Sequence, residues 1–141
     1  AANYPDPDAD RGRQAVTLAL FPHGPGTVEV AREAERLNRP VRAVVGSATS
    51  LPRPVVELIG DGVELDAVKA ADDGSGDLVV RLHEHVGDRR AVTLRCDRPV
   101  AAASRCNLLE EPTAGIEVGD GIVSLTLRPF EIVTLRIVRA A

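Results

Sequence analysis

Short runs in which apolar and polar residues alternate cover most of the chain, and this period of two predicts β-strands. Turn-forming residues separate the runs, as in Gly60-Asp61-Gly62 and Asp97-Arg98-Pro99. Many short strands with such turns predict an all-β fold, an antiparallel β-sandwich formed as a single domain by residues 1–141. We expect strands at residues 14–21, 41–45, 55–59, 63–70, 78–86, 91–96, 100–109, 122–127 and 130–138, within a mainly stranded region 41–139.

The beginning of the chain differs from the rest. Residues 1–13 contain Pro, Asp and Gly without apolar periodicity, which predicts an N-terminal loop. Residues 14–21 are apolar on both faces, with Val16, Leu18 and Leu20 on one of them. A strand with two apolar faces is typical of burial between two layers. We therefore expect this strand to be buried.

Residues 27–38 have the pattern of one short helix. Thr27 is suited to the N-cap, and the helix is expected to end at Asn38 before Pro40. The expected buried stripe recurs every three residues and comprises Val28, Ala31, Ala34 and Leu37.

The last two expected strands form the clearest predicted hairpin. Val123, Leu125 and Leu127 share the core-facing side of the first strand. In the second strand the apolar phase slips by one residue near Ile132, which predicts a β-bulge or bend there. We expect Phe130 and Leu135 both to be buried, although they differ in parity.

Composition bounds the class of protein. The chain has 141 residues, of which 44% are apolar, enough for one domain with its own core. Its net charge of -4 and its scattered Arg residues argue against a nucleic-acid partner. We expect no membrane span, because no apolar run approaches ~20 residues, and no signal peptide, which suggests a cytoplasmic protein. The chain contains no Met, and we expect a processed form or a piece of a longer protein.

The sequence shows no complete catalytic, cofactor-binding or metal-binding motif. There is no Gly-x-Ser-x-Gly, no His-Glu-x-x-His and no phosphate-binding loop. His83 and His85 share one face of an expected strand and could begin a zinc site. Arg81 lies on the same face and disfavours a cation, and no third ligand is nearby, so a polar, exposed face is the preferred interpretation.

Glu84 is placed by parity on the apolar face of its strand, with Leu78, Val80 and Leu82. A carboxylate there must be hydrogen-bonded or paired. We interpret Glu84 as a buried structural carboxylate bonded to backbone amides or to an Arg. The alternative is a catalytic acid with a raised pKa.

Two further residue types leave alternatives open. Cys96 and Cys106 are the only cysteines, and we expect reduced, packed thiols, although their spacing permits a hairpin-spanning bridge.

The aromatic residues are Tyr4, Phe21 and Phe130, and the two Phe residues are expected in the core. An exposed ring on which a sugar stacks is therefore not expected, which weakens an interpretation as an independent glycan-binding module. A protein-interaction sandwich is a third interpretation, and it requires an exposed apolar patch.

Three ordered segments carry a resemblance to a known family. The first runs from Tyr4-Pro-Asp-Pro-Asp-Ala-Asp-Arg-Gly through Ala19-Leu-Phe-Pro-His23 to Glu33-Ala-Glu-Arg-Leu-Asn-Arg-Pro40. The second joins Val68-Lys-Ala-Ala to Val80-Arg-Leu-His-Glu84. The third joins Cys106-Asn-Leu-Leu-Glu110 to Leu127-Arg-Pro-Phe-Glu-Ile-Val-Thr-Leu-Arg136. In this order they resemble the C-terminal region of family 38 glycoside hydrolases, the α-mannosidases of the bacterial type. His83 and Gln14 depart from the family pattern, which more often has an aromatic residue and a His there.

The resemblance implies a retaining, exo-acting α-mannosidase as the parent protein. In that family the Asp nucleophile and the zinc ligands lie in an N-terminal α/β domain, so no catalytic, cofactor or metal residue is carried onto this chain. The resemblance implies a non-catalytic sandwich that packs on the preceding domains of the same polypeptide, inactive by itself, in a protein that acts on α-mannosides and can form homo-oligomers. We expect the domain junction at Asp6, Asp10, Arg11 and His23.

Overall fold

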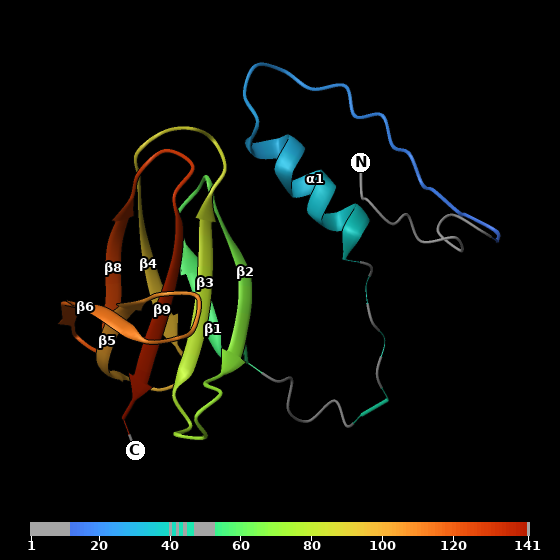
Figure 1. The fold of residues 1–141 in the computed structure, drawn as a ribbon. Coiled ribbons are helices and arrows are strands. Elements are labelled where there is room, and N and C mark those ends of the chain that lie inside the picture. Colours follow the sequence, from blue (N-terminus) through green and yellow to red (C-terminus); the bar gives the residue numbers. More distant parts are fainter. Residues whose placement is uncertain (1–11, 40, 42, 44, 47–52, 141) are drawn as a thin grey trace, which may run out of the picture.

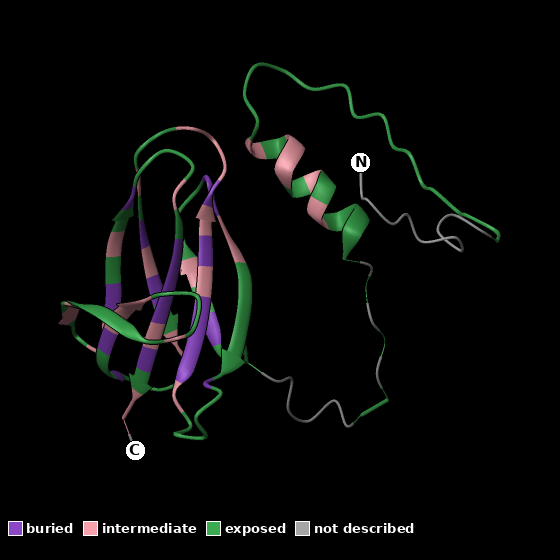
Figure 2. Ribbon diagram, in the orientation of Figure 1, coloured by how far each residue is buried: buried purple, intermediate pink, exposed green. Residues whose placement is uncertain are grey.

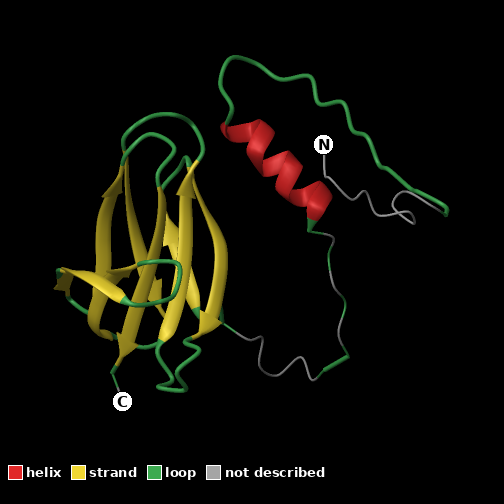
Figure 3. Ribbon diagram, viewed as in Figure 1, coloured by secondary structure: helices red, strands yellow, loops and turns green. Residues whose placement is uncertain are grey.

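The computed structural model describes residues 12–39, 41, 43, 45, 46 and 53–140. Two antiparallel β-sheets pack face to face, with one helix outside them (Figures 1 and 3). The all-β sandwich with one helix near the N-terminus is thus confirmed. The described elements are α1 (Val28–Asn38), β1 (Val56–Ile59), β2 (Val63–Ala70), β3 (Leu78–Glu84), β4 (Arg90–Cys96), β5 (Val100–Cys106), β6 (Pro112–Ile116), β7 (Val118–Gly119), β8 (Ile122–Leu127) and β9 (Ile132–Arg139).

The strands divide into a four-stranded sheet in the order β1-β4-β8-β7 and a five-stranded sheet in the order β2-β3-β9-β5-β6. The C-terminal strand β9 lies in the centre of the five-stranded sheet, between β3 and β5. The β3–β4 and β8–β9 connections both pass from one sheet to the other. The two loops therefore close the same end of the sandwich (Figure 1).

The core lies between the sheets and comes from alternate positions of the strands. Figure 2 shows the buried residues on the strands of the sandwich and none on the helix. Leu82, Leu94, Leu127, Leu135 and Ile137 are fully buried, which accounts for much of the stability at roughly 1.5–3 kcal/mol for each large apolar side chain. The core comprises Val56, Val63, Leu78, Val80, Leu82, Val92, Leu94, Val100, Ala103, Val123, Leu127, Val133, Leu135 and Ile137.

The N-terminal expectations fail in the structure. Residues 13–23 form no strand, and Val16, Leu18 and Leu20 are 80%, 90% and 94% exposed. The helix begins at Val28, as expected from Thr27, although the Thr27 side chain makes no capping hydrogen bond. None of its residues is buried, so the expected buried stripe is also wrong. The apolar pattern is real, but the sandwich does not cover it.

The last two strands are not a hairpin, because β8 pairs with β4 and β7, whereas β9 pairs with β3 and β5. The expected bulge is also wrong, since β9 pairs with β3 in an unbroken register from Ile132 to Ile137. Phe130 lies before the strand, in a turn with φ 57°, and is 71% exposed. The positive φ of Phe130 turns the chain before β9 begins. The odd or even position of Phe130 therefore does not indicate which face of β9 it shares. Leu135 is buried, as expected.

Other strands and boundaries also differ from the sequence prediction, such as β3, which ends at Glu84 rather than at residue 86, and β9, which begins at Ile132 rather than at residue 130. Strands β6 and β7 were not expected, and β5 ends at Cys106 rather than at residue 109. The expected strand 41–45 falls partly outside the described residues, and the described positions 41, 43 and 45 are not in a strand. Within the described part of the chain, no helix has the length and apolar character needed to span a bilayer.

Candidate functional site

The carboxylate of Glu84 holds together the loops that close one end of the sandwich. Glu84 is the last residue of β3 and is 1% exposed, on the core face of the strand. Its Oε1 accepts hydrogen bonds from the backbone N–H groups of Val86 at 2.8 Å and Gly87 at 3.1 Å. Its Oε2 accepts from the N–H groups of Gly87 at 2.9 Å and Phe130 at 2.8 Å. One buried side chain thus satisfies partly buried backbone donors of both loops.

The protonation state of Glu84 follows from these donors. Burial raises the pKa of the carboxyl, but the N–H groups of Phe130, Val86, Gly87 and Asp88 stabilise the anion and lower the pKa to about 2. Glu84 is therefore ionised at neutral pH. A catalytic acid needs a proton to donate, and the alternative of a raised pKa does not fit this environment.

Phe130 is presented to solvent on the loop that Glu84 holds. Its φ of 57° is in the left-handed region, which costs a bulky residue roughly 1–2 kcal/mol. Its ring covers Gly87 so closely that a Cβ atom there would lie 2.7 Å from Cζ of Phe130. The expectation that Phe130 is part of the core is wrong. Phe21, also expected in the core, is 41% exposed.

Glu131 closes the turn that carries Phe130. The N–H of Glu131 donates to the carbonyl of Arg128 at 3.0 Å, and the N–H of Arg128 donates to Oε2 of Glu131 at 2.7 Å. Arg105 of β5 donates to the other carboxylate oxygen at 3.0 Å. Burial raises the pKa of Glu131, while the Arg128 N–H and the Arg105 guanidinium lower it, with a net decrease. The turn that carries the exposed Phe130 is therefore held by two hydrogen-bonded carboxylates, Glu84 and Glu131.

The two His residues on β3 and just after it are paired with carboxylates of β2. Nδ1 of His83 lies 2.8 Å from Oδ1 of Asp66, and Nε2 of His85 lies 3.9 Å from Oε1 of Glu64. The ring centroids are 5.8 Å apart. In the described part of the chain, no group of three or more His, Cys, Asp or Glu side chains is arranged to hold a metal ion. Cys96 and Cys106 are both free and partly buried.

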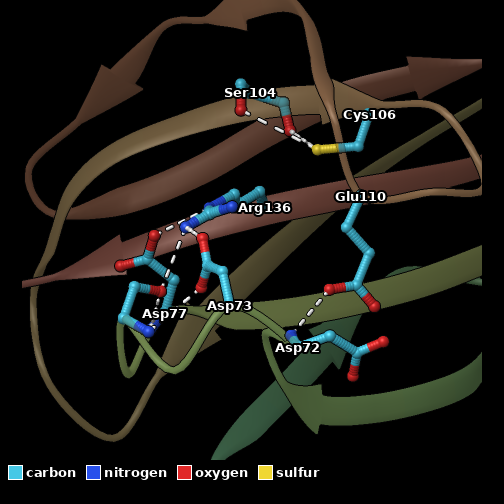
Figure 4. A network of polar contacts seen from close by, with 8 residues as sticks. Asp72, Asp73, Asp77, Ser104, Cys106, Glu110 and Arg136 are labelled. Carbon is cyan, nitrogen blue, oxygen red and sulfur yellow. Dashed lines mark hydrogen bonds and ion pairs between the residues drawn. The ribbon is translucent and has the colours of Figure 1, made fainter.

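A second polar network lies over the outer face of the five-stranded sheet (Figure 4). The guanidinium of Arg136 on β9 donates to Asp77 at 2.7 Å, Asp73 at 2.6 Å and the Ser75 hydroxyl at 3.0 Å. The Ser75 N–H and hydroxyl, followed by Arg136, lower the pKa of Asp73 to about 2. The network fixes the β2–β3 loop on the central strand.

Glu110 connects the same loop to the β5–β6 connection. It has φ 66°, forms an ion pair with Lys69 and accepts a hydrogen bond from the N–H of Asp72 at 3.0 Å. Lys69 and the Asp72 N–H lower the pKa of Glu110. A shallow hollow of about 430 Å³ lies between these groups, next to Leu109 and Arg136. Its acidic side chains already have partners, which are cationic groups, backbone N–H groups or, for Glu111, the side-chain amide of Asn107, and this is typical of a structural network.

The expected junction residues fall in different places. Asp6, Asp10 and Arg11 lie outside the described residues. His23 is exposed, its Nδ1 lies 2.7 Å from the carbonyl of Gly24, and its ring stacks on Phe21 with a centroid distance of 6.3 Å.

The sequence analysis missed the exposed position of Phe130, because the positive φ that exposes it left no signal in the alternation of residues.

Comparison with known proteins gives the family. The family model for the glycosyl hydrolases family 38 C-terminal beta sandwich domain matches residues 62–135. The chain belongs to this family. It is 33% identical to Alpha-mannosidase 2C1 of Mus musculus over 146 aligned positions and 32% identical to Alpha-mannosidase 2C1 of Homo sapiens over 149. Each alignment covers 98% of this chain but 14% of the relative.

The bounds of the family match show which strands and residues of this chain belong to the matched region. The model match runs from the β1–β2 turn to Leu135 of β9, so it contains Glu84, Phe130, Lys69 and Glu110. Residues 1–61 lie outside that match, but most of them lie inside the alignments with the two α-mannosidases, which cover 98% of this chain. The segment with exposed apolar residues is thus shared with the longer relatives and lies outside the family match.

Proposed function

We propose that this chain is the C-terminal, non-catalytic domain of a longer α-mannosidase, and that it packs on the catalytic part and shapes it. The observation that carries the proposal is the similarity to α-mannosidases over 98% of this chain, together with the family match to their C-terminal sandwich. The parent is proposed to be a retaining exo-enzyme that hydrolyses terminal α-mannosyl residues.

The chemistry of the described residues supports a structural role. Glycoside hydrolysis needs one carboxylic acid that donates a proton and a second, ionised carboxylate. Glu84 is buried but held as an anion by backbone N–H groups, and Glu131 is bonded to Arg105 and to a backbone N–H. These groups lock loops in place and have no proton to give near neutral pH.

The remaining parts of the proposal concern the rest of the polypeptide. The zinc implied by the family would be held in the preceding catalytic part, because the described residues here do not provide a ligand set. Asp6, Asp10, Arg11 and His23 are proposed to lie at the junction with that part. The parent is proposed to be a cytoplasmic protein that can form homo-oligomers.

A direct test compares the 141-residue chain with the longer protein. Release of an aryl group from an aryl α-mannoside should require the longer protein and be undetectable with the chain alone, with or without added zinc. NMR of the first product should show the α-anomer if the parent is retaining. Zinc-dependent hydrolysis by the purified chain would overturn the non-catalytic role, and a longer protein inactive on several α-mannosides would overturn the parent's identity.

One observation favours a second candidate function, an independent glycan-binding module. Phe130 lies on a turn fixed by hydrogen bonds and is 71% exposed, and exposed aromatic rings are surfaces on which sugars stack. Calorimetry with mannose and α-mannobiose tests this role on the 141-residue chain. Binding that is lost in Phe130→Ala but kept in the loop control Leu108→Ala would support it, and absence of heat would leave the structural role.

A further inference from the structure

Residues 14–21 are exposed, although most of their side chains are apolar. Figure 1 shows this segment, with α1, outside the sandwich. Val16, Leu18 and Leu20 are at least 80% exposed, and none of residues 13–23 is in a strand. A run of large apolar side chains left in water is unfavourable, at roughly 25 cal/mol for each Å² of apolar surface. The segment therefore has the character of a strand without its sheet.

The charge pattern says which kind of sheet would accept it. The eight residues 14–21 include no charged side chain on either face. Edge strands and strands with a solvent-exposed face usually carry charges, whereas central strands of a sheet covered on both faces do not. The pattern indicates a central strand between two layers.

The sandwich of this chain does not offer such a place. Its open edges include β1, which bears Glu57, and β2, which bears Asp66 and Lys69. Each sheet is covered on its inner face alone, and Arg95 and Arg136 are among the side chains on the outer faces. The other two open edges are β6 and β7. A strand added at any of the four edges would place half of its apolar side chains on an outer face that nothing in the described sandwich covers.

The helix shares this unpartnered character. Its stripe of Val28, Ala31, Ala34 and Leu37 has no buried member, and Leu37 is 48% exposed. The ion pair between Arg32 and Asp61, 2.7 Å long, joins α1 to the sandwich. Both side chains are more than half exposed, and such a pair contributes about 0–1 kcal/mol. The helix is attached to the sandwich weakly.

We infer that residues 14–21 form a central strand of a β-sheet in the preceding part of the polypeptide, and that α1 packs its apolar stripe on that sheet. The inference rests on the proposed function, since it needs a longer parent. The alignments favour this partner, because they cover most of residues 1–61 in relatives of which this chain covers 14%, while the family sandwich match begins at residue 62.

Hydrogen–deuterium exchange tests the strand directly. In the 141-residue chain, the amides of residues 15–21 should exchange at rates close to those of an unstructured peptide. In the longer protein, they should exchange at least about 100-fold more slowly, because a central strand donates its N–H groups to neighbours on both sides. Fast exchange of these amides in an active longer protein would overturn the inference and leave the proposed function standing.

A substitution provides a second readout. Leu18→Lys should lower the thermal midpoint of the longer protein by several degrees or prevent its folding, whereas Leu18→Ile should have little effect. The same Leu18→Lys change should leave the midpoint of the 141-residue chain unaltered, because Leu18 is 90% exposed there. An unchanged midpoint of the longer protein would contradict a buried strand.

Other partners of the segment give different results. Protection that appears in the 141-residue chain and rises with its concentration would show pairing between two copies and overturn the inference. Protection in the chain at all concentrations would show pairing with its own sandwich, with the same consequence. Protection confined to a longer protein without mannosidase activity would support the strand and contradict the proposed function.

Discussion

The backbone N–H of Phe130 donates a 2.8 Å hydrogen bond to the buried carboxylate of Glu84, 46 residues earlier in the chain. The same carboxylate accepts hydrogen bonds from the β3–β4 loop, so one ionised group fixes two of the connections that pass between the sheets at this end. It also holds Phe130 in a conformation with positive φ that the residue would otherwise avoid. The end of the domain is thus built around a charge and an exposed ring.

Replacement of this carboxylate should be costly. Glu84→Gln keeps the shape but removes the charge and turns one acceptor oxygen into a donor that faces backbone N–H groups. Because lost hydrogen bonds to a buried charged group leave donors unsatisfied, we expect a loss of about 3 kcal/mol in the free energy of unfolding. Urea denaturation of the 141-residue chain measures it. Glu57→Gln is the matched control, since Glu57 is half exposed and lies 3.6 Å from Arg95, and it should cost less than about 0.5 kcal/mol. Equal effects of the two changes would contradict the role given to Glu84.

The same group predicts how stability depends on pH. The pKa of Glu84 is about 2 in the folded chain, below the ordinary value of 4.5, because the backbone donors outweigh the effect of burial. As the pH falls, the unfolded chain takes up the proton first, so stability present above about pH 5 is lost progressively toward pH 2. The contribution is about 3 kcal/mol. Urea midpoints measured between pH 7 and pH 2.5 should fall less steeply for Glu84→Gln than for the unchanged chain. Parallel curves for both proteins would contradict the lowered pKa.

The sequence predicted local features far better than relations between distant ones. The alternation of Leu78, Val80 and Leu82 identified a core strand and placed Glu84 on its apolar face, and the structure has these residues buried. Strand β6 was missed because Pro112 and Gly115 interrupt its alternation. The exposure of Phe130 was missed because parity assumes an extended backbone, which a positive φ breaks. The exposure of residues 14–21 could not be foreseen, since an apolar pattern predicts burial without saying which part of a polypeptide provides the cover.

The close contact between Gly87 and Phe130 predicts a coupled pair of substitutions. Gly87→Ala places a Cβ atom 2.7 Å from Cζ of Phe130 and puts an L side chain at φ 85°. Gly74→Ala is the matched control, because Gly74 has φ 73° and nothing lies within 4 Å of the added atom. We expect roughly 1 kcal/mol of backbone strain at both sites and a further 1–2 kcal/mol from the clash at Gly87 alone.

The added Phe130→Ala change separates these two effects. It should relieve the clash part of the Gly87→Ala cost, giving a non-additive double mutant in chemical denaturation, and leave the cost of Gly74→Ala as it was. Additive costs for Gly87→Ala and Phe130→Ala would show that the ring does not rest on Gly87.

Arg136 should control the mobility of the β2–β3 loop. Its guanidinium contacts Asp73, Asp77 and Ser75, and a Lys side chain has a single ammonium group that cannot reach all three with the same geometry. In Arg136→Lys, amides of residues 73–77 should exchange several-fold faster, while those of β3 stay unchanged. Arg95→Lys, on the other sheet, is the control and should leave this loop unaffected. Unchanged exchange in Arg136→Lys would mean that the loop is held by its own turn hydrogen bonds.

Replacement of Phe130 should have different effects on the 141-residue chain and on the longer protein if its ring contacts the catalytic part. Asn adopts a positive φ more readily than Phe, and the ring is 71% exposed, so Phe130→Asn removes backbone strain while giving up little burial. We expect the thermal midpoint of the 141-residue chain to stay the same or rise. The corresponding gain in the free energy of unfolding should be at most about 1 kcal/mol. If the ring instead serves as a contact for the catalytic part, the longer protein carrying the same change should lose stability or activity. The two midpoints, measured by calorimetry, separate these effects. If Phe130 serves folding alone, Phe130→Asn should destabilise both proteins equally. That result would contradict a contact role for the exposed ring.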